Sequence, residues 1–447
     1  MNIRKKELGF IALVSMVIGS QVGSGTFNLP SILAPYKTTG LWGWLLAVPI
    51  AICLAIIFSN LSSRLPKSGG PHVYVAEAFG RKTGFFTAWS YWLVSWSSNS
   101  VILVTIVNYL STITGELSTF QTLAVESLVL LFVTCANLRG LKFSGVVETI
   151  LAILKVLPLL LLPVLFFMSF DSSRFSCDNL PAGKESVSSV LSATALLAFW
   201  GFIGIECATT PASSVKNPKK TLPRAIIAGT LCAALIYIIN IISIVGVVGF
   251  DKLSVSHASY AVAMDAVFGN HSDTLISVFI IMLCIGTLNS WTLSGSQMAY
   301  GAYYNGLFPK SFGKVNKFGV PIAALVFAAL GTLPFLIFEQ ISKGGLSDLT
   351  DMMCSVFLYV YLICCFAHLK LINKWYKTSK EKLVPRVLSC FAIAGCLFVL
   401  SQSVVISIVV IAIFIALGIP VFIRCKDSIK NKSISDNHRK MAEAGRK

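Results

Sequence analysis

The chain has 447 residues, of which 55% are hydrophobic and only 12% are charged. A soluble domain carries about 25% charged residues, so this composition excludes a water-soluble enzyme and a disordered chain. The formal net charge of +17 would suggest a nucleic-acid partner in a soluble protein, but its distribution along the chain indicates a protein of the lipid bilayer that binds no nucleic acid.

Apolar runs taken in chain order predict an all-α, polytopic membrane protein with twelve transmembrane helices. We expect these spans at roughly 8–35, 41–63, 84–111, 120–138, 143–169, 188–212, 224–250, 273–303, 320–338, 347–369, 385–402 and 403–424. The chain outside them is expected to form a cytoplasmic N-terminus at 1–7 and a basic cytoplasmic tail at 425–447.

The distribution of Lys and Arg predicts the orientation of these spans. With the N-terminus in the cytoplasm, 30 of the 36 Lys and Arg residues fall in segments on the inside and five fall on the outside. Cytoplasmic loops of membrane proteins carry an excess of these residues. We therefore expect both termini in the cytoplasm.

Two of the expected spans carry glycines and polar residues in their middle. The first reads MVIGSQVGSGTFNLPSILAPY, and the sixth reads ALLAFWGFIGIECATTPASS. For either span alone, close packing of small residues against a neighbouring helix is the alternative. A pair of interrupted spans at corresponding positions instead indicates the central site of a transporter.

An interrupted pair of helices suits one kind of ligand. Unwinding exposes backbone N–H and C=O groups near the bilayer midplane, where the N-terminus of a half-helix attracts a carboxylate and free carbonyls attract an ammonium. An α-amino acid carries both groups at a fixed separation. The sequence therefore predicts an amino acid or a close relative as the ligand.

Polar residues in the third, fifth and sixth spans are further candidates. Tyr91, Ser95 and Asn99 share one helix face, which predicts a cavity lining, with contact between helices as the alternative. Glu206 is an intramembrane carboxylate, and such costly charges are functional by default. Lys155 lies deep in the fifth span, where snorkelling towards the membrane surface is the alternative.

Four motifs in this order carry a resemblance to a known family: GSGTFNLP, SGGPHVYVAEAFG, FWGFIGIE and VKNPKKTLPRA. They resemble the amino acid–polyamine–organocation superfamily, most closely its bacterial arginine–agmatine antiporter and basic amino acid antiporters. The resemblance implies a bacterial inner membrane protein with a LeuT-type fold, in which helices 1 and 6 are interrupted. The implied units are two inverted five-helix repeats at 8–169 and 188–372, followed by helices 11 and 12 at 385–424.

The resemblance also implies a set of substrate-binding residues. Ser24, with the backbone of Gly23 and Gly25, is expected to hold the substrate carboxylate, and Ser20 stands where the antiporter has Asn. The implied side-chain pocket consists of Trp200, which closes over the substrate, Ile203 beside it, Trp291, which stacks on a guanidinium, and Val94, Ser95 and Asn99 around the distal end, with Val94 replacing a smaller residue.

Gating and coupling residues are implied in the same way. Glu206 and Tyr91 match partners in a gate below the site, to which Trp200 and Trp291 also belong. Lys155 stands where a sodium ion lies in other members of the superfamily, and it implies proton coupling together with Glu206 and Thr287. The arginine–agmatine antiporter lacks this Lys.

We interpret the chain as a secondary transporter that exchanges a basic amino acid (arginine, lysine or ornithine) for its amine or another amino acid by alternating access. Proton-coupled symport of neutral or basic amino acids is the alternative, suggested by Lys155. A channel would not need two interrupted helices, and an enzyme would need a nucleophile–base pair or a metal cluster. The His residues are scattered, so we expect no metal and no cofactor. The resemblance leaves a homodimer open.

Overall fold

A computed structural model describes residues 8–67, 69–139, 145–175, 186–210, 212, 215–269, 271–401 and 404–431. Within these ranges the chain is helical and contains no strand apart from two isolated bridges. A helix satisfies its backbone hydrogen bonds within one segment, as a lipid-embedded chain requires.

The first half of the described chain contains nine α-helices. They are α1 Phe10–Gln21, α2 Ser24–Leu33, α3 Lys37–Arg64, α4 Pro71–Phe79, α5 Arg81–Ser97, α6 Asn99–Thr114, α7 Thr119–Leu138, α8 Gly145–Phe166 and α9 Val187–Phe199. The short 3-10 helices between and after them are η1 Ala34–Tyr36, η2 Phe167–Ser169, η3 Ser172–Phe175, η4 Trp200–Phe202 and η5 Cys207–Thr209.

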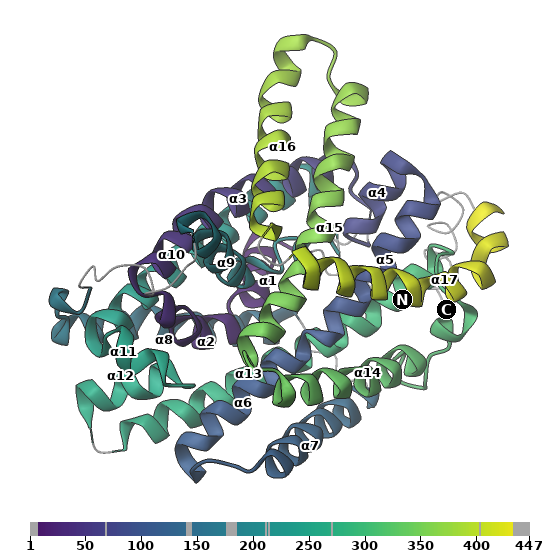
Figure 1. Ribbon diagram of the computed structural model, residues 1–447. Helices are drawn as coiled ribbons and strands as arrows, with labels where there is room; N and C mark the ends of the chain where they lie inside the picture. Colours follow the sequence, from purple (N-terminus) through teal and green to yellow (C-terminus); the bar gives the residue numbers. More distant parts are fainter. Residues whose placement is uncertain are drawn as a thin grey trace.

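The second half of the described chain contains eight α-helices. They are α10 Pro218–Val248, α11 Phe250–Ser254, α12 Ser259–Phe268, α13 Ser272–Tyr304, α14 Ile322–Ile341, α15 Leu346–Trp375, α16 Ser379–Leu400 and α17 Val404–Asn431, with the 3-10 helix η7 Lys310–Gly313. Figure 1 shows α15 and α16 as a hairpin that projects from one end of the molecule, while α7 and α14 lie side by side along the opposite edge.

Ten helical runs in the described part of the chain are long and apolar enough to cross a membrane. One run, Phe10–Arg64, contains both of the first two expected spans, and the fifth expected span contains the shorter apolar helix Lys155–Ser169. The other nine runs correspond in order to the remaining expected spans. The chain is therefore a multi-pass helical membrane protein, and the count of twelve spans stays a prediction.

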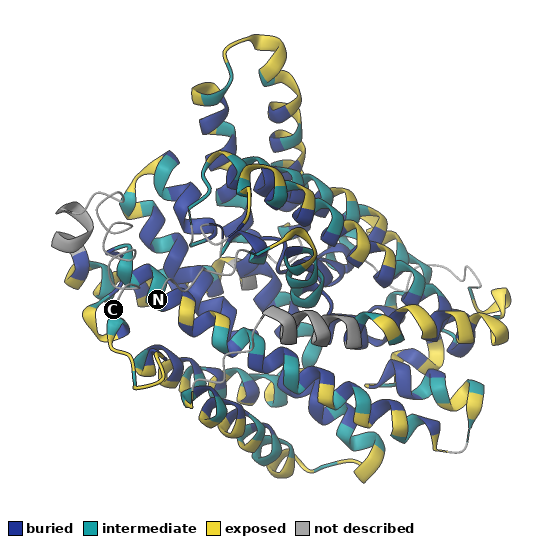
Figure 2. Cartoon of the chain, turned by 180° about the vertical axis from the view of Figure 1, so that it is seen from behind, coloured by how far each residue is buried: buried dark blue, intermediate teal, exposed yellow. Residues whose placement is uncertain are grey.

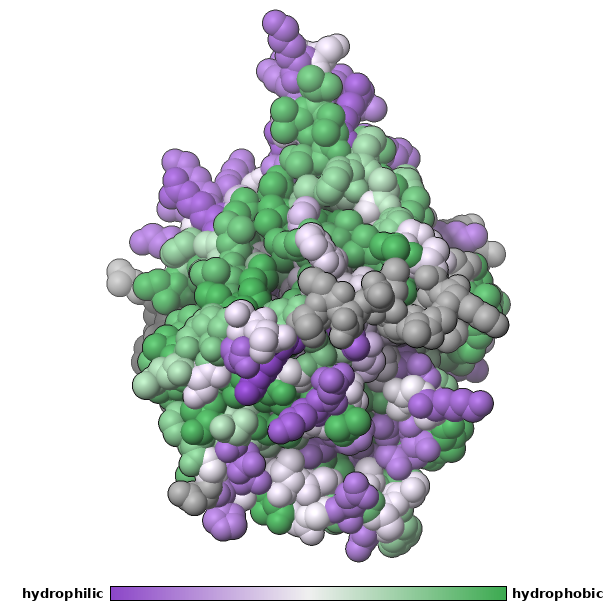
Figure 3. All heavy atoms as spheres, turned by 60° about the vertical axis from the view of Figure 1, so that its left-hand side comes forward, coloured by the Kyte–Doolittle hydropathy of each residue, from purple (hydrophilic) through white to green (hydrophobic). Residues whose placement is uncertain are grey.

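Burial separates central helices from peripheral ones. In the run Arg81–Thr114 the most apolar stretch is 89% buried, whereas in Thr119–Leu138 it is only 22% buried. Figure 2 shows the same contrast between a buried interior and outer helices with an exposed stripe. Hydrophobic side chains cover the middle of the surface in Figure 3, and hydrophilic ones gather at the tip of the α15–α16 hairpin and at the lower end. This surface suits a bilayer.

Helix interruptions occur in both spans where glycines predicted them. α1 ends at Gln21, and α2 begins at Ser24. α9 ends at Phe199 and is followed by η4, a turn over 203–206, and η5. α5 and α6 are separated only by Ser98, whose backbone keeps helical angles, so Arg81–Thr114 forms one helical run of 34 residues.

Candidate functional site

A small cavity lies between the two interrupted spans. Eight expected residues line it: Ser20, Gly23, Ser24, Gly25, Trp200, Ile203, Trp291 and Thr287. Gln21, Ser98 and Ile102 complete the lining and were missed by sequence reasoning. The cavity measures about 30 Å³, which is room for about two water molecules and too little for an amino acid. The site is therefore closed around its own side chains.

Two glycines allow the interrupted segments to approach each other. A Cβ atom on Gly25 would lie 2.7 Å from Cδ1 of Trp200, and one on Gly204 would lie 2.6 Å from Oγ of Ser20. Gly204 also has a φ of +105°, in the region that favours glycine. The glycines therefore allow both close packing between helices and unwinding of the backbone, so the two explanations given for them do not exclude each other.

Side chains from other helices bind the backbone groups that the interruptions release. The Ser20 hydroxyl lies 3.1 Å from the carbonyl oxygen of Gly204 and 2.9 Å from that of Val17. The Tyr237 hydroxyl donates to the carbonyl of Gln21 at 2.8 Å. Such partners are required where backbone polar groups are buried within a membrane.

The cavity has polar ends but no charged lining. The first N–H groups of α2 at Ser24 and Gly25 form the positive end of a helix dipole, and α1 ends at the same interruption with its negative end. Among the described residues that line the cavity, none is charged. Recognition of a zwitterion here would therefore depend on backbone groups, hydroxyls and the faces of Trp200 and Trp291.

Glu206 is held by two tyrosines from separate helices. The hydroxyl of Tyr91 on α5 donates to Glu206 Oε1 at 2.6 Å, and the hydroxyl of Tyr361 on α15 donates to Oε2. The Tyr361 hydroxyl also accepts the N–H of Gly204 at 3.1 Å. Glu206 is completely buried. Sequence reasoning paired Glu206 with Tyr91 but missed Tyr361, whose only signal was a polar group in the middle of the tenth span.

Three expected residues of the third span lie outside the lining of the closed cavity. Val94 and Ser95 are buried, and Ser95 packs towards Gly295 of α13. The Asn99 amide donates to the Thr292 hydroxyl at 3.3 Å, next to Trp291 in the chain. The side chains that reach the cavity from this region are Ser98 and, one helical turn later, Ile102.

Lys155 is 6% exposed, so its amino group lies inside the protein. The Thr287 hydroxyl donates to the carbonyl of Leu283 at 2.9 Å, and its side chain lines the central cavity. α8, which carries Lys155, packs against α1 and α10.

The end of the molecule that carries Leu8 is closed by contacts between distant segments. The N–H of Lys216 donates to the carbonyl of Leu8 at 3.1 Å, and the N–H of Gly69 donates to that of Thr210 at 3.3 Å. Lys374 forms an ion pair with Glu77 at 2.8 Å. The hydrogen bond and charge of Lys374 lower the pKa of the Glu77 carboxyl, so the pair is formed at neutral pH.

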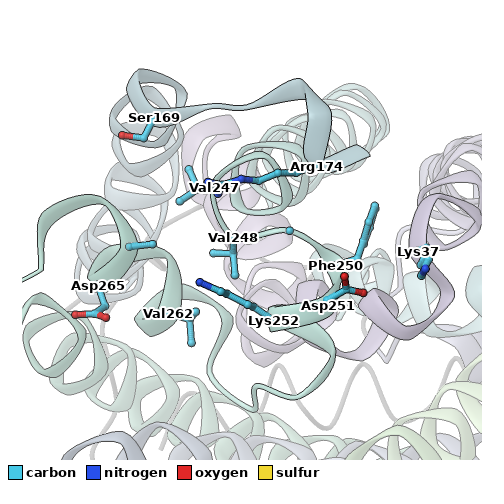
Figure 4. A pocket seen from close by; sticks show the side chains of 12 residues that line it. Lys37, Ser169, Arg174, Val247, Val248, Phe250, Asp251, Lys252, Val262 and Asp265 are labelled. Atoms are coloured by element: carbon cyan, nitrogen blue, oxygen red, sulfur yellow. The ribbon is translucent and has the colours of Figure 1, made fainter. Parts of the chain in front are cut away.

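The opposite end has two larger cavities. One measures about 510 Å³ and is lined by residues that include Asn28, Asn108 and Glu339. Asn28 lies on α2, the helix whose first residue, Ser24, lines the central cavity. The other measures about 650 Å³, and Figure 4 shows Arg174 and Lys252 pointing into it from η3 and α11. None of the expected site residues lines this larger cavity. Within the described ranges, no group of His, Cys, Asp or Glu could hold a metal ion.

Comparisons with known proteins agree with this architecture. The chain is 29% identical over 371 residues to the cadaverine/lysine antiporter of Escherichia coli strain K12, covering 80% of this chain and 82% of the relative. It is 26% identical over 445 residues to the arginine/ornithine antiporter of Pseudomonas aeruginosa, covering 95% and 92%. The putrescine transporter PotE of Haemophilus influenzae is 27% identical over 339 residues, covering 74% and 77%.

A family model described as amino acid permease matches residues 8–434. This match extends over nearly the whole chain, including both interrupted spans, the tyrosine-bound Glu206 and Lys155. The chain belongs to the amino acid permease family, within the amino acid–polyamine–organocation superfamily.

Proposed function

We propose that this permease exchanges a basic amino acid for its decarboxylated amine or for another amino acid by alternating access. One observation carries the proposal: an uncharged cavity, framed by two helix interruptions and two tryptophans, lies at the centre of the molecule. The relatives named as antiporters of cadaverine and lysine, and of arginine and ornithine, support the choice of a basic substrate.

The roles of the residues follow from their places. The N–H groups at the start of α2, with Ser24, bind the substrate carboxylate, because the positive end of a helix dipole favours an anion. Trp200 covers the substrate, since its ring lies against Gly25 in the closed cavity. Trp291 offers an aromatic face to the cationic side chain. Movement of the Trp200 side chain from this covering position to an open one would admit the substrate.

Alternating access also requires a gate on each side. We assign the inner gate to Glu206 with its two tyrosines, together with the contacts that close the Leu8 end. By the positive-inside rule we assign that end to the cytoplasm of a bacterium. We assign the fold twelve spans and two inverted five-helix repeats. On this assignment, we propose that the structure represents a state closed to the cytoplasm, with a cavity on the external side.

Proton-coupled symport is the second candidate, and the buried Lys155 favours it. A Lys that gains and loses a proton as the helices rearrange would drive net uptake without a counter-substrate. Exchange and symport differ in one property: an exchanger releases labelled substrate only when the other side holds a substrate. A channel would show neither saturation nor counterflow.

Counterflow in proteoliposomes tests the proposal. Vesicles loaded with lysine, arginine, ornithine, cadaverine or a neutral amino acid are diluted into labelled lysine, and uptake above equilibrium is measured. We expect accumulation with basic partners and loss of transport in Ser24→Lys, whose side chain fills the carboxylate position. Ser173→Lys, at an exposed serine of η3, is the matched control. Normal transport by Ser24→Lys would show that the site lies elsewhere.

A further inference from the structure

The cavity of about 650 Å³ lies where two apolar helices end. Its lining includes Val247 and Val248, the last residues of α10, and Ser169, the last residue of the apolar helix Lys155–Ser169. Apolar helices of a membrane protein end where the hydrocarbon core gives way to the lipid headgroups. With the orientation assigned above, the cavity therefore lies at the level of the headgroups of the outer leaflet.

Close packing fixes the walls of this cavity. The ring of Phe170 lies directly on Gly246 of α10 and leaves no room there for a Cβ atom. The N–H of Asp171 donates to the carbonyl of Gly246 at 2.9 Å. The ring of Phe175 in η3 packs on Phe170 and on Phe250 of α11, with centroid distances of 5.7 and 6.1 Å. η3 is thereby attached to α10 and α11.

Basic residues gather in this cavity. Three of the five Lys and Arg residues expected on the external side line it: Lys37, Arg174 and Lys252. Figure 4 shows the charged ends of Arg174 and Lys252 pointing into it. Lys37 has a φ of +49° and a ψ of −137°, which residues with a side chain rarely adopt, and such strain is concentrated at functional sites. Because external loops are poor in Lys and Arg, this cluster favours an anionic ligand.

The charge of the lining suits a phosphodiester. Asp251 and Asp265 also line the cavity, so its three cations and two carboxylates leave an excess of one positive charge. Arg174 forms an exposed ion pair at 3.7 Å with Asp171, which does not line the cavity, and such a pair contributes little. Neither lysine of the lining takes part in an ion pair within the described ranges. A phosphodiester carries a single negative charge, and its oxygens accept hydrogen bonds from Arg and Lys.

An exposed apolar face of α8 leads to the same cavity. Its residues recur at helical spacing and end next to Ser169: Leu157, Leu161, Val164 and Met168. Each is at least 52% exposed, and Met168 is 81% exposed. The valines of the lining continue this apolar surface inside the cavity. A ligand with a phosphate head and acyl chains would match both the basic cavity and the apolar face.

We propose that this cavity binds the headgroup of a phospholipid of the outer leaflet. The phosphodiester lies between Arg174 and Lys252, Lys37 adds its charge, and the acyl chains run along the exposed face of α8. The lipid site shares no lining residue with the central cavity, and it does not depend on which substrate is exchanged.

Native mass spectrometry of the full-length protein in detergent tests the site. Three probes are compared: dioleoyl phosphatidylglycerol, dioleoylglycerol, which lacks the phosphate, and inorganic phosphate, which lacks the chains. We expect saturable binding of the phospholipid only. Lys252→Gln should weaken this binding about fivefold, the usual contribution of one basic residue near an anionic headgroup, and Lys252→Arg should retain it.

Lys343→Gln is the matched control, because Lys343 is an exposed lysine that borders the other external cavity. It should bind the phospholipid as the wild type does. A phospholipid with a photoreactive diazirine in the middle of one acyl chain locates the chains. Its crosslinks to Leu161 and Val164 should fall in Lys252→Gln and stay unchanged in the control. Crosslinks to Leu330, an exposed residue of α14, should be equal in all variants.

Each outcome decides the proposal. Equal binding of dioleoylglycerol, or equal affinities of Lys252→Gln and Lys343→Gln, would show that the basic cavity does not select the headgroup. If inorganic phosphate displaces the phospholipid at equal concentration, the cavity takes a soluble anion and the lipid site is refuted. Since no transport is measured, failure of the proposed exchange would leave this result unaffected.

Discussion

Removal of the Tyr361 hydroxyl should destabilise the protein more than removal of any neighbouring tyrosine hydroxyl. In Tyr361→Phe, Glu206 Oε2 loses a donor and the N–H of Gly204 loses an acceptor. Both residues are buried, and both belong to the unwound segment. Each unsatisfied buried group costs about 1–3 kcal/mol, so we expect a loss of about 2–5 kcal/mol in the free energy of unfolding. Tyr91→Phe removes one bond only and should cost about 1–3 kcal/mol.

The matched control is Tyr359→Phe on the same helix. Tyr359 is partly exposed, and no hydrogen bond of its hydroxyl occurs in the described residues, so its removal should change the free energy by less than about 0.5 kcal/mol. The assay is thermal and denaturant unfolding of the purified protein in one detergent, followed by tryptophan fluorescence. If Tyr361→Phe is as stable as Tyr359→Phe, the hydrogen bonds to Glu206 and Gly204 do not hold the segment.

Three other perturbations address recognition, coupling and pH. Trp291→Leu should weaken binding of lysine or arginine about two- to thirtyfold more than binding of a small neutral amino acid, because a cation–π contact is lost; equal losses for all ligands in equilibrium binding would remove this role. Lys155→Ala should slow uptake and flatten its dependence on pH, and Lys155→Arg should not rescue, because Arg stays charged; an Arg variant with an unchanged pH profile would make Lys155 a structural charge only. Burial lowers the pKa of His72 from 6.5 to about 4. Between these two pH values the unfolded chain therefore binds more protons than the folded chain. The free energy of unfolding should fall by about 2–3 kcal/mol as the pH drops from about 6.5 to 4. His72→Gln should reduce that slope in unfolding curves taken at each pH, whereas His271→Gln, at an exposed residue, should not.

The sequence predicted the interrupted spans because their cause is local. Gly204 has a positive φ and leaves space for Ser20, and in the sequence it stands out as a second glycine within the span, three residues after Gly201 and two before Glu206. Glu206 was predictable for the same reason, since a carboxylate within an apolar run is too costly to persist there without a function. Its partner Tyr361 was not predictable, because a tyrosine in a transmembrane helix can pack against another helix, lie at the membrane interface or belong to a gate. Only the packing of α15 against α5 selects among these.

Register explains the difference at the third span. Tyr91, Ser95 and Asn99 follow one another in steps of four residues, but a helix has about 3.6 residues per turn, so each step turns the side chain by about 40° and Asn99 points about 80° away from Tyr91. Asn99 then reaches Thr292 of α13, and Ser98 reaches the cavity. Ser98 and Ile102, which come seven and eleven residues after Tyr91, point within about 20° of its direction, so counting in steps of four residues selects the wrong members of the face.

A chain of hydrogen bonds joins the central cavity to the inner gate through one residue. The carbonyl of Gly204 faces the Ser20 hydroxyl, and its N–H donates to Tyr361, which in turn donates to Glu206. Enlarging the cavity to admit a substrate requires Trp200 to move away from α2, and Trp200 is four residues from Gly204 on the same unwound segment. Between Trp200 and Gly204 this segment has only the 3-10 turn of η4, closed by the N–H of Ile203 on the carbonyl of Trp200 at 3.3 Å, and we propose that its displacement is transmitted to the partners of Gly204. We therefore propose that substrate binding at the central cavity and release of the gate are two effects of one movement, as an exchanger that must not open to both sides at once requires.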